Sequence, residues 1–189
     1  MNSNRIAKVW TGVAARTLCL SLLLALSVMA LTSQSSAQDG SLSFQGGIGV
    51  INVIGQNPDS TLKLNMVRGV TPAAPWVIAA LTANITSDGH ISVVGRGLLL
   101  SAGEGIGTNA GASVHATLFC GPVGSATAFD EPGVKLDAAG NFKINDFLTP
   151  VPALPCENPV LLIRSGVTPG QGVWFAAGMQ TSNLAQAVK

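Results

Sequence analysis

The most regular pattern in the chain is a pair of alternating apolar and polar runs between residues 76 and 100. Apolar or small side chains occupy every second position, the period of a half-buried strand, at Val77, Ala79, Leu81, Ala83 and Ile85 and again at Ile91, Val93, Gly95, Gly97 and Leu99. A three-residue loop at residues 87–89 aligns the two apolar faces, whereas a two-residue loop would mix them. We therefore predict a hairpin that pairs Ile85 with Ile91, places Gly95 opposite Leu81 to make room for it, and holds Gly89 at positive φ.

Two shorter patterns lie downstream. A five-residue loop at residues 137–141 would align Leu136 with Phe142 and Val134 with Ile144, which predicts a second hairpin. Residues 160–163 are apolar without interruption. An uninterrupted run of this length is typical of a central strand that is covered on both faces.

With the remaining turn-bounded runs, the pattern predicts about eight or nine short strands. No long segment with a period of 3.6 residues separates them, which argues against a parallel α/β fold. We find no internal repeat of fixed period. We expect one all-β domain over residues 38–189, built as an antiparallel β-sandwich or barrel.

The first 37 residues have the pattern of a secretory signal peptide. The basic residues Arg5, Lys8 and Arg16 precede an apolar stretch at residues 18–31, and small residues follow at 35–37. The apolar stretch is shorter than the ~20 residues that span a bilayer. We therefore expect a secreted or periplasmic protein whose mature chain starts near Gln38 and contains no transmembrane segment.

The mature chain carries little charge. Removal of the signal peptide leaves seven basic and nine acidic residues, a net charge of about −2. The basic residues are scattered singly along the sequence, at Lys63, Arg68, Arg96, Lys135, Lys143, Arg164 and Lys189. A nucleic-acid-binding protein would show a basic stripe, so we expect no nucleic-acid partner.

Two cysteines remain after the signal peptide, Cys120 and Cys156. A metal or redox pair is one interpretation, but the neighbouring sequence offers no further ligands. An even number of cysteines in an oxidising compartment favours a structural disulfide, which we predict.

Candidate catalytic residues are few. The mature chain has two histidines, His90 and His115, and neither has a second metal ligand nearby in sequence. His115 could form a triad with a serine and Asp130, but no Gly-x-Ser-x-Gly segment places a nucleophile. Asp130 and Glu131 share a turn and could offer oxygens to calcium, although no calcium-loop motif surrounds them. We expect no metal and no cofactor, and structural roles for most of these side chains.

Glycines at 103, 105, 107 and 111 form the most glycine-rich segment. Their spacing does not match a dinucleotide fingerprint, and a strand rather than a helix follows them. Binding residues often lie in such loops, so residues 103–111 and the proline-rich residues 149–159 are the expected contact surface. Glu104, His115 and Asp130 are the candidate binding residues.

Four segments resemble a group of small secreted bacterial β-rich proteins of unassigned activity: residues 95–100 (GRGLLL), 105–108 (GIGT), 159–164 (PVLLIR) and 174–178 (WFAAG). The resemblance covers most of the mature chain and implies no functional residues. The chain is also distantly similar to secreted β-sandwich modules of the chordin-domain type, but their histidine-containing motif is missing here.

These observations favour a secreted or periplasmic binding or structural module over an enzyme, with an unknown protein or small molecule as its ligand. One alternative is a hydrolase or isomerase assembled from loop residues such as Glu104, His115 and Asp130. Another is a cell-surface protein that self-assembles through exposed sheet edges.

Overall fold

A computed structural model describes residues 40–181. The expected signal peptide, residues 1–37, lies outside the described residues. The part described contains thirteen strands and no helix, and therefore no helix able to cross a membrane. The all-β class predicted from the sequence is confirmed.

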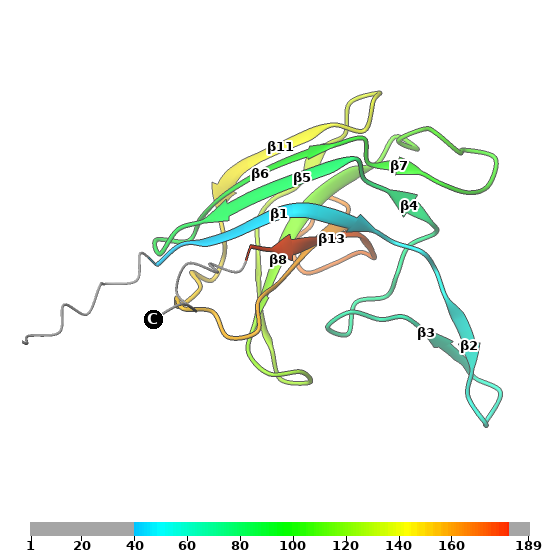
Figure 1. Ribbon diagram of the computed structural model, residues 1–189, viewed down its shortest axis with the longest axis horizontal. Coiled ribbons are helices and arrows are strands. Elements are labelled where there is room, and N and C mark those ends of the chain that lie inside the picture. The colour runs from blue at the N-terminus through cyan, green and yellow to red at the C-terminus, as the bar shows by residue number, and fades with distance from the viewer. Residues whose placement is uncertain (1–39, 182–189) are drawn as a thin grey trace, which may run out of the picture. The chain divides into compact units, whose positions relative to one another are not determined.

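Most strands belong to one antiparallel sheet. Its members are β1 (Leu42–Gly49), β5 (Ala80–Ile85), β6 (His90–Arg96), β8 (Ser113–Cys120), β9 (Thr127–Asp130), β10 (Val134–Lys135), β11 (Phe142–Phe147), β12 (Val160–Ser165) and β13 (Trp174–Gln180). Their order is β10-β8-β12-β13-β1-β5-β6-β11, and β9 pairs with β8. The sheet curls into a half-barrel: β1, β5, β6 and β11 form one layer, and β8 and β13 cross beneath it (Figure 1).

Two small ribbons complete the strands. β2 (Ile54–Gln56) pairs with β3 (Leu62–Leu64), and this hairpin extends away from the half-barrel (Figure 1). β4 (Trp76–Val77) pairs with β7 (Leu99–Leu100) and continues the line of β5 and β6.

The hairpin predicted at residues 76–100 is confirmed in register. Ile85 pairs with Ile91, and Leu81 pairs with Gly95. Gly89 has a φ of 84°, as the three-residue turn requires. A Cβ at Gly95 would collide with the ring of Phe142, which reaches across from β11. The nearest neighbour that requires a glycine here is therefore Phe142, which the sequence did not predict.

The two strands of the second predicted hairpin do not pair with each other. The chain does turn at residues 137–141, where Asp137 N–H donates to the Asn141 carbonyl at 3.0 Å. β10 then pairs with β8, and β11 pairs with β6, at opposite ends of the sheet. The turn therefore joins the two edges of the half-barrel. A bridge between Asp130 and Thr149 joins them a second time.

The apolar core lies inside the curl. Alternate residues of β1, β5, β6 and β11 are buried there, and the residues between them are mostly exposed. In β8 and β12 both faces are buried, which confirms the central, doubly covered strand expected at residues 160–163. Leu161 and Ile163 belong to the core cluster and are fully buried.

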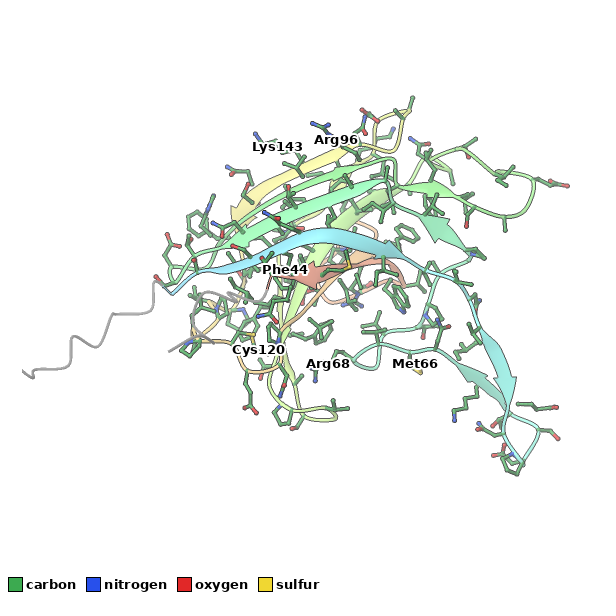
Figure 2. All side chains as sticks on the ribbon, in the orientation of Figure 1. Phe44, Met66, Arg68, Arg96, Cys120 and Lys143 are labelled. Carbon is green, nitrogen blue, oxygen red and sulfur yellow. A yellow bond between two sulfur atoms is a disulfide. The ribbon has the colours of Figure 1, made fainter. Side chains whose placement is uncertain are left out.

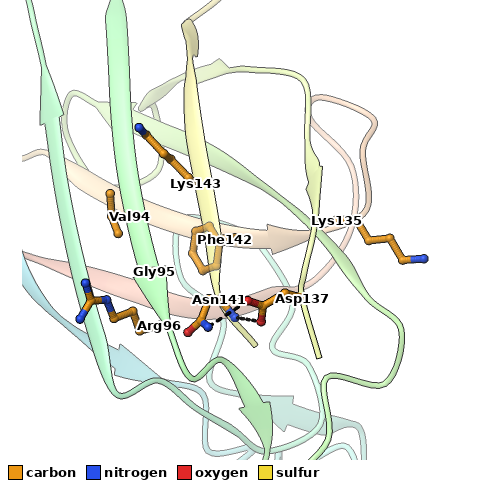
Figure 3. Close-up of a pocket in the computed structure, with 8 residues that line it drawn as sticks. All are labelled: Val94, Gly95, Arg96, Lys135, Asp137, Asn141, Phe142 and Lys143. Carbon is orange, nitrogen blue, oxygen red and sulfur yellow. Dashed lines mark hydrogen bonds between the residues drawn. The ribbon is translucent and has the colours of Figure 1, made fainter. Parts of the chain in front are cut away.

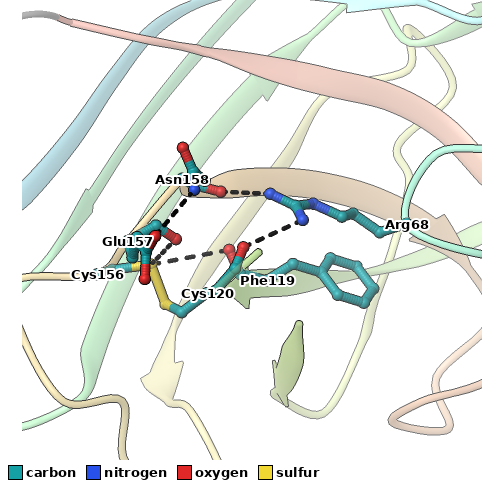
Figure 4. The surroundings of a disulfide bond; sticks show 7 residues. Arg68, Phe119, Cys120, Cys156, Glu157 and Asn158 are labelled. Carbon is teal, nitrogen blue, oxygen red and sulfur yellow. Dashed lines mark hydrogen bonds between the residues drawn. A yellow bond between two sulfur atoms is a disulfide. The ribbon is translucent and has the colours of Figure 1, made fainter. Parts of the chain in front are cut away.

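The predicted disulfide between Cys120 and Cys156 is present, with Cα atoms 5.2 Å apart. It connects the end of β8 to the proline-rich segment before β12. Figure 4 shows Arg68 beside it, donating to the carbonyls of Gly121 at 3.1 Å and Asn158 at 2.6 Å. The disulfide and the guanidinium together hold three separate chain segments at this end of the sheet.

Candidate functional site

A polar cluster lies on the face of β8 and β12 that points away from the core. Arg164 of β12 pairs with His115 of β8, and Asp130 of β9 pairs with Thr117 of β8, so all four side chains share this face. An Asp130 oxygen, Oδ1, is 3.8 Å from His115 Nε2 and 3.8 Å from Arg164 Nη1. Thr117 Oγ1 donates a hydrogen bond to the same oxygen.

The segment between β12 and β13 covers this cluster. Arg164 Nη2 donates to the carbonyls of Gly170 and Gly172, each at 3.0 Å, and His115 Nδ1 lies 3.2 Å from the Gly166 carbonyl. His115 is 0% exposed and Asp130 8% exposed. The cluster therefore fastens a loop to the sheet and is closed to a substrate.

The buried environment determines the charge of this cluster. Burial lowers the pKa of His115, and the nearby Arg164 charge lowers it further, against the opposing effects of the Gly166 carbonyl and Asp130. Burial also lowers the pKa of Arg164, while Asp130 raises it. Both the lowered pKa and the burial favour a neutral His115 at pH 7.

Of the three candidate binding residues, the structure brings two together. His115 and Asp130 are neighbours in the buried cluster. Glu104 is exposed in the glycine-rich loop before β8, and within residues 40–181 no hydrogen bond or ion pair joins it to either of them. The three do not form one accessible site.

Glu131, next in the chain, directly follows β9. It is 1% exposed, and its Oε1 accepts a 2.6 Å hydrogen bond from Ala116 N–H. Its Oε2 has no hydrogen-bond partner in the part of the chain described. Burial raises the pKa of Glu131 to about 7, and the charges of Asp146 and Asp130 act in the same direction, while the Ala116 hydrogen bond lowers it. Among residues 40–181 no group of three or more His, Cys, Asp or Glu side chains is arranged to hold a metal ion.

A second candidate site is the outer face of the sheet formed by β1, β5, β6 and β11. The registers of these strands align outward-pointing residues in rows. One row is Ser43, Asn84, Ser92 and Asn145, and the next is Gln45, Thr82, Val94 and Lys143. All are exposed or half-buried. Figure 2 shows Lys143 and Arg96 projecting from this face, with Phe44 beneath it.

A groove of about 630 Å³ lies at one side of this face. Arg96 and Lys143 extend from β6 and β11, and Lys135 extends from β10 on the other side (Figure 3). These are three of the six Lys and Arg residues in the described part of the chain. The ion pairs formed there involve Asp130 with His115 and Arg164, so the three groove cations have no acidic partner.

The groove also contains one carboxylate, Asp137, which is held by its own turn. It accepts hydrogen bonds from Asn141 N–H at 2.8 Å, Asn141 Nδ2 at 3.0 Å and Ala139 N–H at 2.9 Å. These bonds lower the pKa of Asp137. With three cations and one anion, the groove carries a net charge of +2 at pH 7.

A smaller groove of about 240 Å³ adjoins the cationic one. Its polar side chains come from β1, β5 and β6: Ser43, Gln45, Thr82, Asn84 and Ser92. Val94 lines both grooves, so the two lie next to each other on the sheet.

Sequence reasoning missed this surface because its basic residues are far apart in the chain. The available signal was the alternation in β6, which places Arg96 on the outer face with Ser92 and Val94. Lys143 joins them only through the pairing of β11 with β6, which the sequence did not predict.

Comparison with known proteins identifies no relative: no family model, no curated protein and no solved structure matches the chain. The resemblance to small secreted bacterial β-rich proteins therefore stays a prediction.

Proposed function

We propose that the chain is an exported, non-catalytic binding module and that its ligand is an anion held in the groove between Arg96, Lys143 and Lys135. The signal-peptide pattern supports export. The oxidised pair Cys120–Cys156 supports it too, because structural disulfides persist mainly outside the cytoplasm.

The observation that carries the proposal is that three cations without an acidic partner in residues 40–181 line one groove. Lys143 of β11 pairs with Val94 of β6, and Arg96 lies two residues after Val94 on β6. Side chains related in this diagonal way lie roughly 7–8 Å apart at Cα. Both flexible side chains carry a positive charge on the same outer face, and an anion bound between them would gain charge-assisted hydrogen bonds.

The location of the groups with shifted pKa values supports binding rather than catalysis. Catalytic groups in a cleft characteristically have shifted pKa values. Asp137 is the groove residue with a shifted pKa, and the hydrogen bonds of its own turn account for that shift. His115, Glu131 and Arg164 also have shifted pKa values, but all three are buried and none of them lines the cationic groove.

Dextran sulfate and dextran test the proposal because they share a backbone and differ in charge. Isothermal titration calorimetry at low ionic strength should detect binding of the mature protein to dextran sulfate and not to dextran. Replacing Arg96 and Lys143 together by Gln should weaken binding by about tenfold or more, and added salt should weaken it in the wild type.

Lys63→Gln is the matched control, since Lys63 is an exposed cation on β3, away from the groove. It should leave the affinity for dextran sulfate within about twofold of the wild type. Absence of dextran sulfate binding, or an equal loss from Lys63→Gln, would overturn the proposal.

A further inference from the structure

We infer that the anion is part of an acidic saccharide chain, whose charged group lies in the cationic groove and whose hydroxyl groups continue over the polar groove on β6, β5 and β1. This inference rests on the proposed function and adds the chemical class of the ligand.

The first argument is the chemistry of the polar groove. Within residues 40–181, the side-chain hydrogen bond formed in this groove runs from Ser43 Oγ to Asn84 Oδ1, at 3.0 Å. The side chains of Gln45, Thr82 and Ser92 have no partner in the same part of the chain. Hydroxyl and amide groups both donate and accept hydrogen bonds, as sugar hydroxyls do, so these side chains match a polyhydroxylated ligand.

The second argument is continuity. Lys143, Val94, Thr82 and Gln45 form one row of exposed residues across β11, β6, β5 and β1, and Val94 lines both grooves, so a ligand lying along this row would contact both. Four neighbouring strands span ~15 Å at the usual strand spacing. A single small anion would occupy only the cationic end of such a row, whereas a chain of sugar rings would use all of it.

The charge distribution favours an acidic saccharide over a nucleic acid. A nucleic acid presents a phosphate at every nucleotide and draws its affinity from many Lys and Arg contacts. Here the cations are confined to one end of the surface, and the side chains that line the polar groove are uncharged. Bases also stack on exposed aromatic rings, but the aromatic residues that line the two grooves, Phe142 and Phe44, are 6% and 1% exposed. The exposed Phe147 lies further along β11, outside both grooves.

The test removes hydroxyl groups without changing charge. In the full mature protein, Thr82→Val combined with Ser92→Ala should weaken binding to dextran sulfate about fivefold or more, because two hydrogen-bonding groups are lost. The same variant should bind polyphosphate, a polyanion without hydroxyl groups, as the wild type does. Thr127→Val on β9 is the matched control, since Thr127 is an exposed strand threonine outside both grooves.

The outcomes separate this inference from the proposed function. Loss of dextran sulfate affinity with polyphosphate affinity kept supports the saccharide inference. Unchanged dextran sulfate affinity, or equal losses for both polyanions, overturns the inference and leaves the anion-binding proposal standing if the Arg96 and Lys143 variant still loses affinity. If the wild type binds neither polyanion, both fail.

Discussion

Replacing Glu131 by Gln should stabilise the protein in a way that depends on pH. The Glu131 carboxyl is 1% exposed and accepts one backbone hydrogen bond, from Ala116 N–H. A Gln carbonyl oxygen can accept the same bond without ever ionising. The substitution therefore removes a buried charge and keeps the shape and the hydrogen bond.

The size of this stabilisation follows from the pKa of Glu131. Burial raises the pKa of Glu131 from 4.5 to about 7. Well below pH 4.5 the carboxyl is protonated in both the folded and the unfolded chain, so it costs no stability. As the pH rises towards 7 and beyond, the unfolded chain releases its proton more readily than the folded one, and folding becomes less favourable. At 1.36 kcal/mol for each pKa unit, the cost reaches about 3 kcal/mol above pH 8.

Urea unfolding followed by tryptophan fluorescence measures this effect. The free energies of unfolding of the wild type and Glu131→Gln should agree at about pH 4 and differ by about 3 kcal/mol at about pH 8, with the variant more stable. Glu104→Gln makes the same chemical change at an exposed loop position and should show no such divergence. The reasoning is refuted if the difference between the wild type and Glu131→Gln is the same at both pH values.

Three further predictions concern the remaining buried features. Burial lowers the pKa of His115 below its ordinary value of 6.5. As the pH falls below about 6.5, the unfolded chain therefore takes up a proton on this histidine more readily than the folded chain, and stability is lost. Unfolding free energies from about pH 7.5 to about pH 5 should decline more steeply in the wild type than in His115→Gln. Gly95→Ala should cost about 1–3 kcal/mol in urea unfolding through collision with the Phe142 ring, and clearly less in a Phe142→Leu background; equal costs in both would contradict the packing argument. Replacing Cys120 and Cys156 by Ser should lower the unfolding free energy by up to about 4 kcal/mol, and thiol titration of the unfolded, unreduced wild type should find no free thiol; two free thiols would contradict the bond.

Local patterns predicted the parts of the fold that depend on neighbouring residues. In the hairpin of β5 and β6, both strands alternate and the turn length alone decides which faces agree, so the register could be derived. The disulfide could likewise be predicted, because residues 38–189 contain only two cysteines.

The strand pairings that close the half-barrel could not be predicted from local sequence patterns. Val134 and Ile144 alternate as a hairpin would, yet their strands belong to opposite edges of the sheet. Curvature decides that outcome, and it arises from the twist of the whole sheet rather than from the local pattern. The burial of Glu131 was not predicted either, because residues 130–133 have the composition of an exposed turn.

The candidate site was predicted only in part. His115 and Asp130 do meet, because β8 and β9 are joined by a short turn and pair directly. The cationic groove could not be foreseen, since Arg96, Lys135 and Lys143 come from three strands whose pairing depends on how the sheet closes.

The central claim is that ligand binds on the outer face of β1, β5, β6 and β11. The most direct test is two-dimensional NMR of ¹⁵N-labelled protein comprising residues 38–189 during titration with dextran sulfate. We expect the largest amide shift changes at residues 94–96 and 143, smaller ones at Thr82 and Gln45, and none on the β2–β3 hairpin. Changes confined to residues 103–111 or 149–159, with the sheet face unaffected, would contradict the account.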